Sequence, residues 1–215
     1  NDGSGQFAWA GPAWDIGAGV YGTGLAVGDW DADGLVDVFL GAVGGDRLYR
    51  NTGQGFEDVT EAAGVAGDAA AWTSSPAFLD VDGDSDLDLF VPRYVKWSAE
   101  KDEALNFTLN GTDRAYGPPK QYEGTVSALW LNEGDGTFTD ASERAGLHVL
   151  NPATGAPVGK SLAVAPADLD RDGDIDLLVA NDTTRNFYFR NRGNGTFEEA
   201  GVDLGVAYDQ QGTAT

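Results

Sequence analysis

The chain contains no cysteine, few basic residues and no long apolar run. Without cysteine it has no disulfide framework, no thiolate zinc site and no cysteine nucleophile. No segment approaches the roughly 18 apolar residues that a membrane helix requires, and no secretory signal is visible. Lysine and arginine number 13 against 35 acidic residues, giving a formal net charge of −22. This balance disfavours nucleic acid and anionic membranes as partners and favours cations.

The size and composition describe a globular chain rich in short strands. Its 215 residues are 41% hydrophobic and 11% aromatic, which is enough for a substantial core. The 31 glycines and 8 prolines favour short strands joined by tight turns over long helices. We therefore expect an all-β fold.

An acidic motif occurs three times along the chain. The stretches DWDADGLVD at 29–37, DVDGDSDLD at 80–88 and DLDRDGDID at 168–176 all follow the pattern D-x-D-x-D-[GS]-x-x-D. Each is preceded and followed by an apolar-alternating run, which is typical of a loop that joins two strands.

Each acidic motif is followed by an N-x-G-x-G turn. The turns begin at Asn51, Asn132 and Asn191, after one strand-like run and before another that starts with phenylalanine. The repeating unit therefore comprises four strands. Repeated four-stranded units of this length predict a β-propeller, with about three blades present.

The spacing within the unit locates an insertion. The first aspartate precedes the turn asparagine by 22 residues in the first unit and by 23 in the third, but by 52 in the second. We assign the excess to residues 93–124 and predict blade units at roughly 20–65, 72–147 and 159–206. Insertions on a repeat scaffold often carry recognition, so we expect partner contact there, with Trp97 as a candidate.

The spacing of the acidic motif suits calcium. Carboxylates at positions 1, 3 and 5 of a coiled loop converge on one point, a backbone carbonyl at position 7 joins them, and position 9 closes the shell. Hard, charged oxygen ligands in a flexible loop select calcium over zinc, copper or magnesium. The predicted ligands of up to three calcium ions are the carboxylates of Asp29, Asp31, Asp33, Asp37, Asp80, Asp82, Asp84, Asp88, Asp168, Asp170, Asp172 and Asp176, with the carbonyls of Leu35, Asp86 and Asp174.

Two details refine this interpretation. Glycine at position 6, which is Gly34 or Gly173, supplies a turn with positive φ, whereas Ser85 in the second loop leaves calcium binding there open. An EF-hand would carry glutamate at position 12 and helices on both sides. Position 12 is apolar here and the flanks are strand-like, so an EF-hand is disfavoured. Solvated acidic turns without a metal are the alternative interpretation.

The repeat resembles the FG-GAP or VCBS-type repeats of the integrin α-subunit propeller, with DVFLGAV matching the apolar Gly-Ala strand. It is similar still more closely to the cartilage acidic protein family, the ASPIC/UnbV group of secreted and bacterial proteins. The phrases that carry the resemblance are GTGLAVGDWDADGLVDVFLG, RLYRNTGQGFEDVTEAAGV, AYGPP before ALWLNEGDGTFTDASERAGL, and GKSLAVAPADLDRDGDIDLLVANDTTRNFYFRNRGNGTFEE. They cover nearly the whole chain.

This resemblance implies a seven-bladed, calcium-binding propeller that is extracellular, secreted or periplasmic. Each predicted aspartate ligand falls on a motif position of the family. With about three blades present, we expect the chain to be part of a longer protein or to be completed by another chain. Family members often carry cysteines in the long insertion; without them, we expect residues 93–124 to be held by packing alone or to remain mobile.

The leading functional hypothesis is a non-enzymatic, calcium-stabilised adhesion, scaffold or protein-interaction module with a protein or carbohydrate partner at the cell surface. No catalytic residue is assigned. The alternative is a polysaccharide lyase or hydrolase on the same scaffold, for which Arg93, Tyr94, Lys96 and Tyr122 are the residues to test. A third hypothesis is a subunit of a larger surface assembly.

Overall fold

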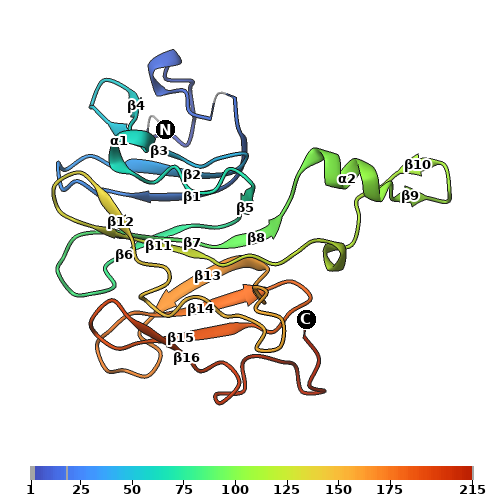
Figure 1. Cartoon of the computed structure of the whole chain (residues 1–215). Helices are drawn as coiled ribbons and strands as arrows, with labels where there is room; N and C mark the ends of the chain where they lie inside the picture. Colours follow the sequence, from blue (N-terminus) through green and yellow to red (C-terminus); the bar gives the residue numbers. More distant parts are fainter. Residues whose placement is uncertain (1–2, 18, 215) are drawn as a thin grey trace.

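Three four-stranded antiparallel arrangements dominate the computed structural model, which describes residues 3–17 and 19–214 (Figure 1). Unit 1 contains β1 (Tyr21–Gly28), β2 (Asp37–Val43), β3 (Arg47–Asn51) and β4 (Phe56–Asp58). Unit 2 contains β6 (Ala77–Leu79), β7 (Asp88–Val91), β11 (Ala128–Asn132) and β12 (Phe138–Asp140). Unit 3 contains β13 (Ser161–Ala167), β14 (Asp176–Asn181), β15 (Phe187–Asn191) and β16 (Phe197–Glu199). The predicted all-β repeat of four strands is confirmed, and none of these described sheets closes on itself.

The strands follow the apolar pattern of the sequence. In β2 all residues but the last are buried, which fits a continuous apolar run covered on both faces. In β1, Leu25 and Val27 are exposed on either side of buried Ala26, as expected for a strand with one covered face.

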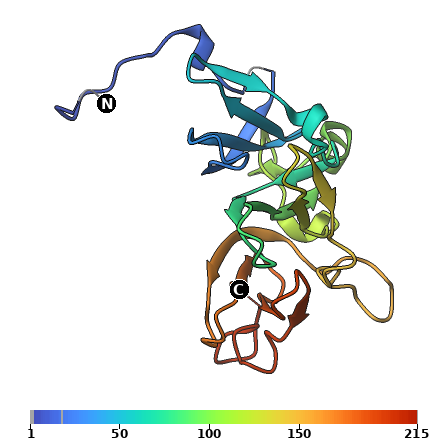
Figure 2. The ribbon, with the colours of Figure 1, turned by 90° about the vertical axis from the view of Figure 1, so that its left-hand side faces the viewer.

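The three units stack on one another and share two hydrophobic cores (Figures 1 and 2). The core between units 1 and 2 includes Phe39 and Leu89, and the core between units 2 and 3 includes Phe90, Leu177 and Phe189. Leu89 and Phe90 are neighbours on β7, and their side chains enter opposite cores because successive strand residues alternate between faces. Unit 2 is therefore held from both sides.

The segment directly before unit 2 extends the sheet of unit 1. Strand β5 (Ala71–Thr73) does not join the sheet of unit 2. It pairs with β2 of unit 1 through Val43 and Trp72, and with β8 (Arg93–Lys96). The reason lies in strand length: β3 pairs only with residues 38–40 of β2, so the far end of β2 is available to another strand. The sheet around unit 1 thus has six strands.

The predicted insertion, residues 93–124, is named the arm, and most of it projects away from the sheets (Figure 1). It contains β8, α2 (Ala99–Leu105), β9 (Thr108–Leu109), β10 (Asp113–Arg114) and the 3₁₀ turn η2 (Pro119–Gln121). Asp102 on α2 accepts a hydrogen bond from Tyr122 Oη at 2.5 Å and forms an ion pair with Arg114. Hydrogen bonding and charge therefore hold the arm in addition to packing.

The base of the arm also contacts unit 3. Tyr94 Oη donates to Asp182 Oδ2 at 2.5 Å, and Lys160 Nζ donates to the carbonyl of Pro119 at 2.6 Å. These bonds join β8 and η2 to segments that adjoin β14 and β13. The arm is thus anchored on the unit that follows it.

Two residues shortly before β1 pack on unit 1. Ile16 and Val20 pack against a small cluster formed by Val38, Leu40 and Tyr49. Two short helical elements, η1 (Pro12–Trp14) and α1 (Thr60–Ala63), complete the described structure. Among the described residues, no helix combines the length and apolar character needed to cross a membrane.

Candidate cation-binding loops

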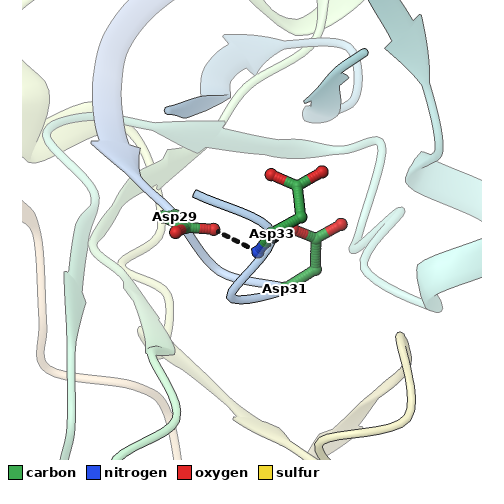
Figure 3. A group of neighbouring side chains, drawn as sticks. All are labelled: Asp29, Asp31 and Asp33. Carbon is green, nitrogen blue, oxygen red and sulfur yellow. Dashed lines mark hydrogen bonds between the residues drawn. The ribbon is translucent and has the colours of Figure 1, made fainter. Parts of the chain in front are cut away.

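Each acidic loop is wrapped around its first aspartate. The carboxylate of Asp29 accepts a hydrogen bond from the N–H group of Asp33 at 3.0 Å (Figure 3). It accepts another from the N–H group of Gly34 at 2.9 Å. Asp80 accepts from the N–H groups at positions 4 and 6 of its loop at 2.7 and 3.0 Å, and Asp168 does so at 2.7 and 3.2 Å. These bonds hold the loop backbone in a coil.

The backbone enters the left-handed region twice in every loop. At position 4 the φ angles are 56° for Ala32, 81° for Gly83 and 67° for Arg171, and at position 6 they are 87° for Gly34, 77° for Ser85 and 103° for Gly173. The positive φ predicted at position 6 is confirmed. The one at position 4 could not be predicted, because alanine and arginine disfavour this conformation. Ser85 adopts the same conformation as the glycines, so all three loops follow one course.

Carboxylate oxygens gather in every loop, but not from the same positions. The groups whose oxygens lie within 4.8 Å of one another are Asp29, Asp31 and Asp33; Asp80, Asp82 and Asp88; and Asp168, Asp170 and Asp176. Two oxygens bound to one calcium ion, each at about 2.3–2.6 Å, lie at most about 5 Å apart. Each group is therefore compact enough to share a metal ion.

The other predicted ligands lie outside these groups. They are Asp37 at position 9, Asp84 and Asp172 at position 5, and the three residues at position 7. The N–H groups of Leu35, Asp86 and Asp174 donate to the position 5 carboxylates of their loops at 2.9, 2.9 and 3.0 Å. Coordination by their carbonyl groups stays a prediction.

The aspartate at position 9 joins the loop to the turn asparagine of its own unit. Asp37 accepts hydrogen bonds from the N–H groups of Trp30 at 3.2 Å and Asn51 at 2.7 Å. Asp88 and Asp176 likewise accept from the N–H groups of the residue at position 2 of their loop and of the turn asparagine of their unit. These two distances are 2.9 and 2.9 Å for Asp88, and 3.0 and 2.8 Å for Asp176. All three are at most 1% exposed. Position 9 therefore shapes the unit whether or not it also binds an ion.

Burial and mutual repulsion raise the pKa values of several loop carboxyl groups. Burial is the main cause for Asp88, whose pKa rises to about 7, and for Asp37, whose pKa rises to about 6. Burial followed by the negative charge of Asp84 raises the pKa of Asp82. A cation bound among these groups acts in the opposite direction, because it favours the charged form.

Arginine side chains supply positive charge to two of the loops. Arg50 Nε lies 2.6 Å from Asp31 Oδ2, and its Nη2 lies 3.3 Å from Asp33 Oδ2. Arg190 Nε lies 3.1 Å from Asp170 Oδ2. Neither Nε atom has a hydrogen-bond partner among the described residues, so the Nε contacts are electrostatic, whereas Arg50 Nη2 also donates a hydrogen bond to Asp33 Oδ2. A metal ion in these loops would share its carboxylates with an arginine.

The second loop has no such arginine. The residue before the turn asparagine, which is arginine in units 1 and 3, is Leu131 in unit 2. Asp82 Oδ1 is shielded from solvent and has no hydrogen-bond partner among the described residues. An unpaired carboxylate oxygen of this kind fits a metal ligand. Calcium binding by the second loop was uncertain from the sequence because of Ser85. Among the residues that the structure describes, this loop is the one of the three whose carboxylates are not paired with an arginine.

The fold and these loops define a class: β-rich repeat proteins in which each unit carries an acidic loop between its first two strands. The family model of the FG-GAP-like repeat matches residues 29–91, 121–179 and 168–214. The matches cover more than half of the chain, and the protein belongs to the FG-GAP-like repeat family. This repeat points to a protein-interaction or adhesion-type module. No match was found among the curated proteins compared with it. Residues 92–120, which include most of the arm, lie outside the matches.

Two parts of the site were not predicted from the sequence. The arginines Arg50 and Arg190 lie 19 and 20 residues beyond the aspartates that they contact, Asp31 and Asp170. The signal that could have found them is their shared place directly before the turn asparagine. The turn asparagines Asn132 and Asn191 also form side-chain hydrogen bonds to the preceding unit. No local sequence pattern predicts these bonds, because their partners are far away in the chain.

Proposed function

We propose that this protein is a calcium-binding, non-enzymatic interaction module whose three units are consecutive blades of a β-propeller of the ASPIC/UnbV and integrin α-subunit type. The observation that carries the proposal is the gathering of carboxylate oxygens at the same place in all three units. Donor sets made only of charged oxygens are those that calcium prefers. The stacked antiparallel sheets of four strands support the propeller arrangement.

The residues of the chain prepare each site before a cation arrives. The first aspartate shapes the loop, position 9 ties the loop to the third strand, and the carboxylates at positions 1 and 3 face a common point. Bound calcium supplies positive charge that offsets the repulsion among these groups. Because the unfolded chain lacks the preformed loops, calcium binding adds to the free energy of unfolding.

Thermal unfolding in calcium and in chelator tests the proposal. In about 1 mM calcium we expect a midpoint about 5–10 °C above that in chelator, because a ligand at many times its Kd stabilises by a few kcal/mol. Asp82→Asn should reduce this shift, since it removes charge from the second loop. Asp203→Asn removes the same charge from an exposed position outside the loops and should leave the shift unchanged.

Two results would contradict the assignment. A midpoint that does not respond to chelation would exclude calcium as a structural ligand. Equal effects of Asp82→Asn and Asp203→Asn would mean that calcium only screens the net charge of −22. Titration calorimetry with calcium and with magnesium then separates the two ions, because magnesium demands a stricter octahedral geometry.

The proposed setting is extracellular, secreted or periplasmic. FG-GAP-like repeats are typical of extracellular proteins, and loops of this kind are filled at the roughly millimolar calcium concentrations outside cells. Detection of the native protein in the medium or periplasm, rather than in the cytosol, tests this placement.

The proposed surface for a protein or carbohydrate partner is the arm. Tyr116 is fully exposed and Leu109 is 61% exposed at its outer part, whereas Trp97 packs edge to face on Trp72. Exposed aromatic and aliphatic groups on a projecting segment favour recognition. Tyr116→Ser should weaken adhesion of cells to a surface coated with the protein. Tyr208→Ser, at an exposed position outside the arm, should not.

No observation favours the polysaccharide-processing alternative. Burial, followed by the hydrogen bond to Asp102, raises the pKa of Tyr122 to about 12, and burial with the bond to Asp182 raises the pKa of Tyr94. A phenolate base needs a lowered pKa, so both tyrosines are shifted in the wrong direction. Turnover of uronic-acid polymers that disappears in Tyr94→Phe would restore this alternative.

A further inference from the structure

The turn asparagines of units 2 and 3 each bridge two acidic loops. Asn132 Nδ2 donates to the Leu87 carbonyl in its own loop at 3.2 Å and to the Trp30 carbonyl in the loop of unit 1 at 2.8 Å. Asn191 Nδ2 repeats this arrangement with Ile175 of its own loop at 3.1 Å and Val81 of unit 2 at 2.8 Å. The first unit offers a contrast, because the Nδ2 atom of its asparagine donates to Val36 of its own loop at 3.0 Å.

The carbonyl reached from the next unit always belongs to position 2 of the loop. Trp30 and Val81 at this position are 5% and 2% exposed, because the following unit covers them. Leu169 occupies the same position in the third loop, which no described unit follows, and it is 49% exposed. The first aspartates differ in the same way: Asp29 and Asp80 are half-buried and Asp168 is exposed.

We propose that Asn132 and Asn191 are positioning residues for the cation loop of the preceding unit. This inference rests on the proposed calcium function. Position 2 lies between the aspartates at positions 1 and 3, so a hydrogen bond to its carbonyl fixes the peptide that joins two ligands. Fixing that peptide before the cation binds removes conformational freedom that the loop would otherwise lose on binding. Each loop is then completed by the unit that stacks on it.

The prediction is a specific pattern of calcium affinities among the loops. Asn132→Ala should weaken calcium binding about five- to tenfold in loops 29–37 and 80–88 and leave loop 168–176 unchanged, as expected for the loss of about 1 kcal/mol per hydrogen bond. Asn191→Ala should weaken the second and third loops and spare the first. Asn51→Ala is the matched control. It removes the same bond within the turn and the same bond to the residue's own loop, but no bond to another described unit, so it should weaken the first loop alone.

Hydrogen–deuterium exchange of the full chain, titrated with calcium, resolves the three loops by peptide. Exchange of β7, between the two cores, reports whether each variant is folded. Asn132→Ser is a second variant: its hydroxyl oxygen can accept from the Gly134 N–H, which Asn132 Oδ1 accepts at 3.0 Å, but it lacks the amide donor and adds no charge. It should show the same loop pattern as Asn132→Ala.

The outcomes separate this inference from the proposed function. If calcium protects none of the loops in the unmodified chain, both are wrong. If calcium protects the loops but Asn132→Ala affects only loop 80–88, the asparagine is a local turn residue and only this inference is wrong. A uniform loss in all three loops, with faster exchange in β7, would show general destabilisation and would also overturn it.

Discussion

Arg50 lies against the first acidic loop, with its Nε atom 2.6 Å from Asp31 Oδ2. In unit 2 the equivalent residue is Leu131, so the chain itself contains a loop without this competing cation. We predict that Arg50→Leu tightens calcium binding by loop 29–37 about threefold to fivefold, the range expected for a partly exposed ion pair. Titration calorimetry in an Asp82→Asn background measures this change while calcium binding by the second loop is already weakened.

The control for this substitution is Arg192→Leu. Arg192 pairs with Glu198 at 3.4 Å, outside the acidic loops, and its loss changes the net charge by the same amount. Equal effects of the two substitutions would show that general charge, rather than the contact with Asp31, sets the calcium affinity.

Ser85 is held at φ 77°, a conformation that costs non-glycine residues about 1–2 kcal/mol. We predict that Ser85→Gly raises the free energy of unfolding by about 0.5–1 kcal/mol, since the relief of strain exceeds the added freedom of the unfolded chain. Ser85→Ala keeps the strained φ and should give no such gain. Urea unfolding of the two variants in chelator measures the difference, and equal stabilities would contradict the strain argument.

The raised pKa values of Asp37 and Asp88 predict how stability depends on pH without calcium. Their folded pKa values of about 6 and 7 exceed the unfolded value of about 3.9, so the folded chain binds more protons between about pH 4 and pH 7. The free energy of unfolding must then fall as pH rises through this range. In chelator we predict a thermal midpoint lower at about pH 8 than at about pH 5. Calcium should reduce the difference, because it binds the charged carboxylates.

Asp88→Asn provides the control for this pH dependence. The amide does not titrate, so the variant should lose part of the decline between the two pH values even though its stability at each is lower. Its stability falls because one of the two N–H donors, of Val81 or Asn132, no longer faces an acceptor. A decline as steep as in the unmodified chain would assign the effect to the other carboxylates.

Features determined by neighbouring residues were predictable from the sequence. The acidic motifs, the turns at Asn51, Asn132 and Asn191 and the apolar alternation give the four-stranded units and the position 6 turns. What could not be predicted depends on residues far apart in the chain. Asn191 meets Val81 across 110 residues, and β5 pairs with β2 only because β3 leaves the end of that strand free. The left-handed φ of Arg171 likewise contradicts its local preference and arises from the course of the whole loop.

The close approach of β1 to the segment that joins β5 to β6 depends on Gly24. A Cβ atom at this position would lie 1.6 Å from the Ser74 carbonyl oxygen, which is backbone and cannot rotate away. We predict that Gly24→Ala destabilises the protein by about 3 kcal/mol or more, because β1 and the backbone at Ser74 must move apart to accommodate the methyl group. Gly44→Ala is the control: its Cβ meets no atom within 4 Å, but its φ of 92° disfavours alanine, so a smaller loss of about 1 kcal/mol is expected. Urea unfolding in chelator compares the two variants. Equal losses would mean that backbone conformation, not the contact with Ser74, explains why glycine occupies position 24.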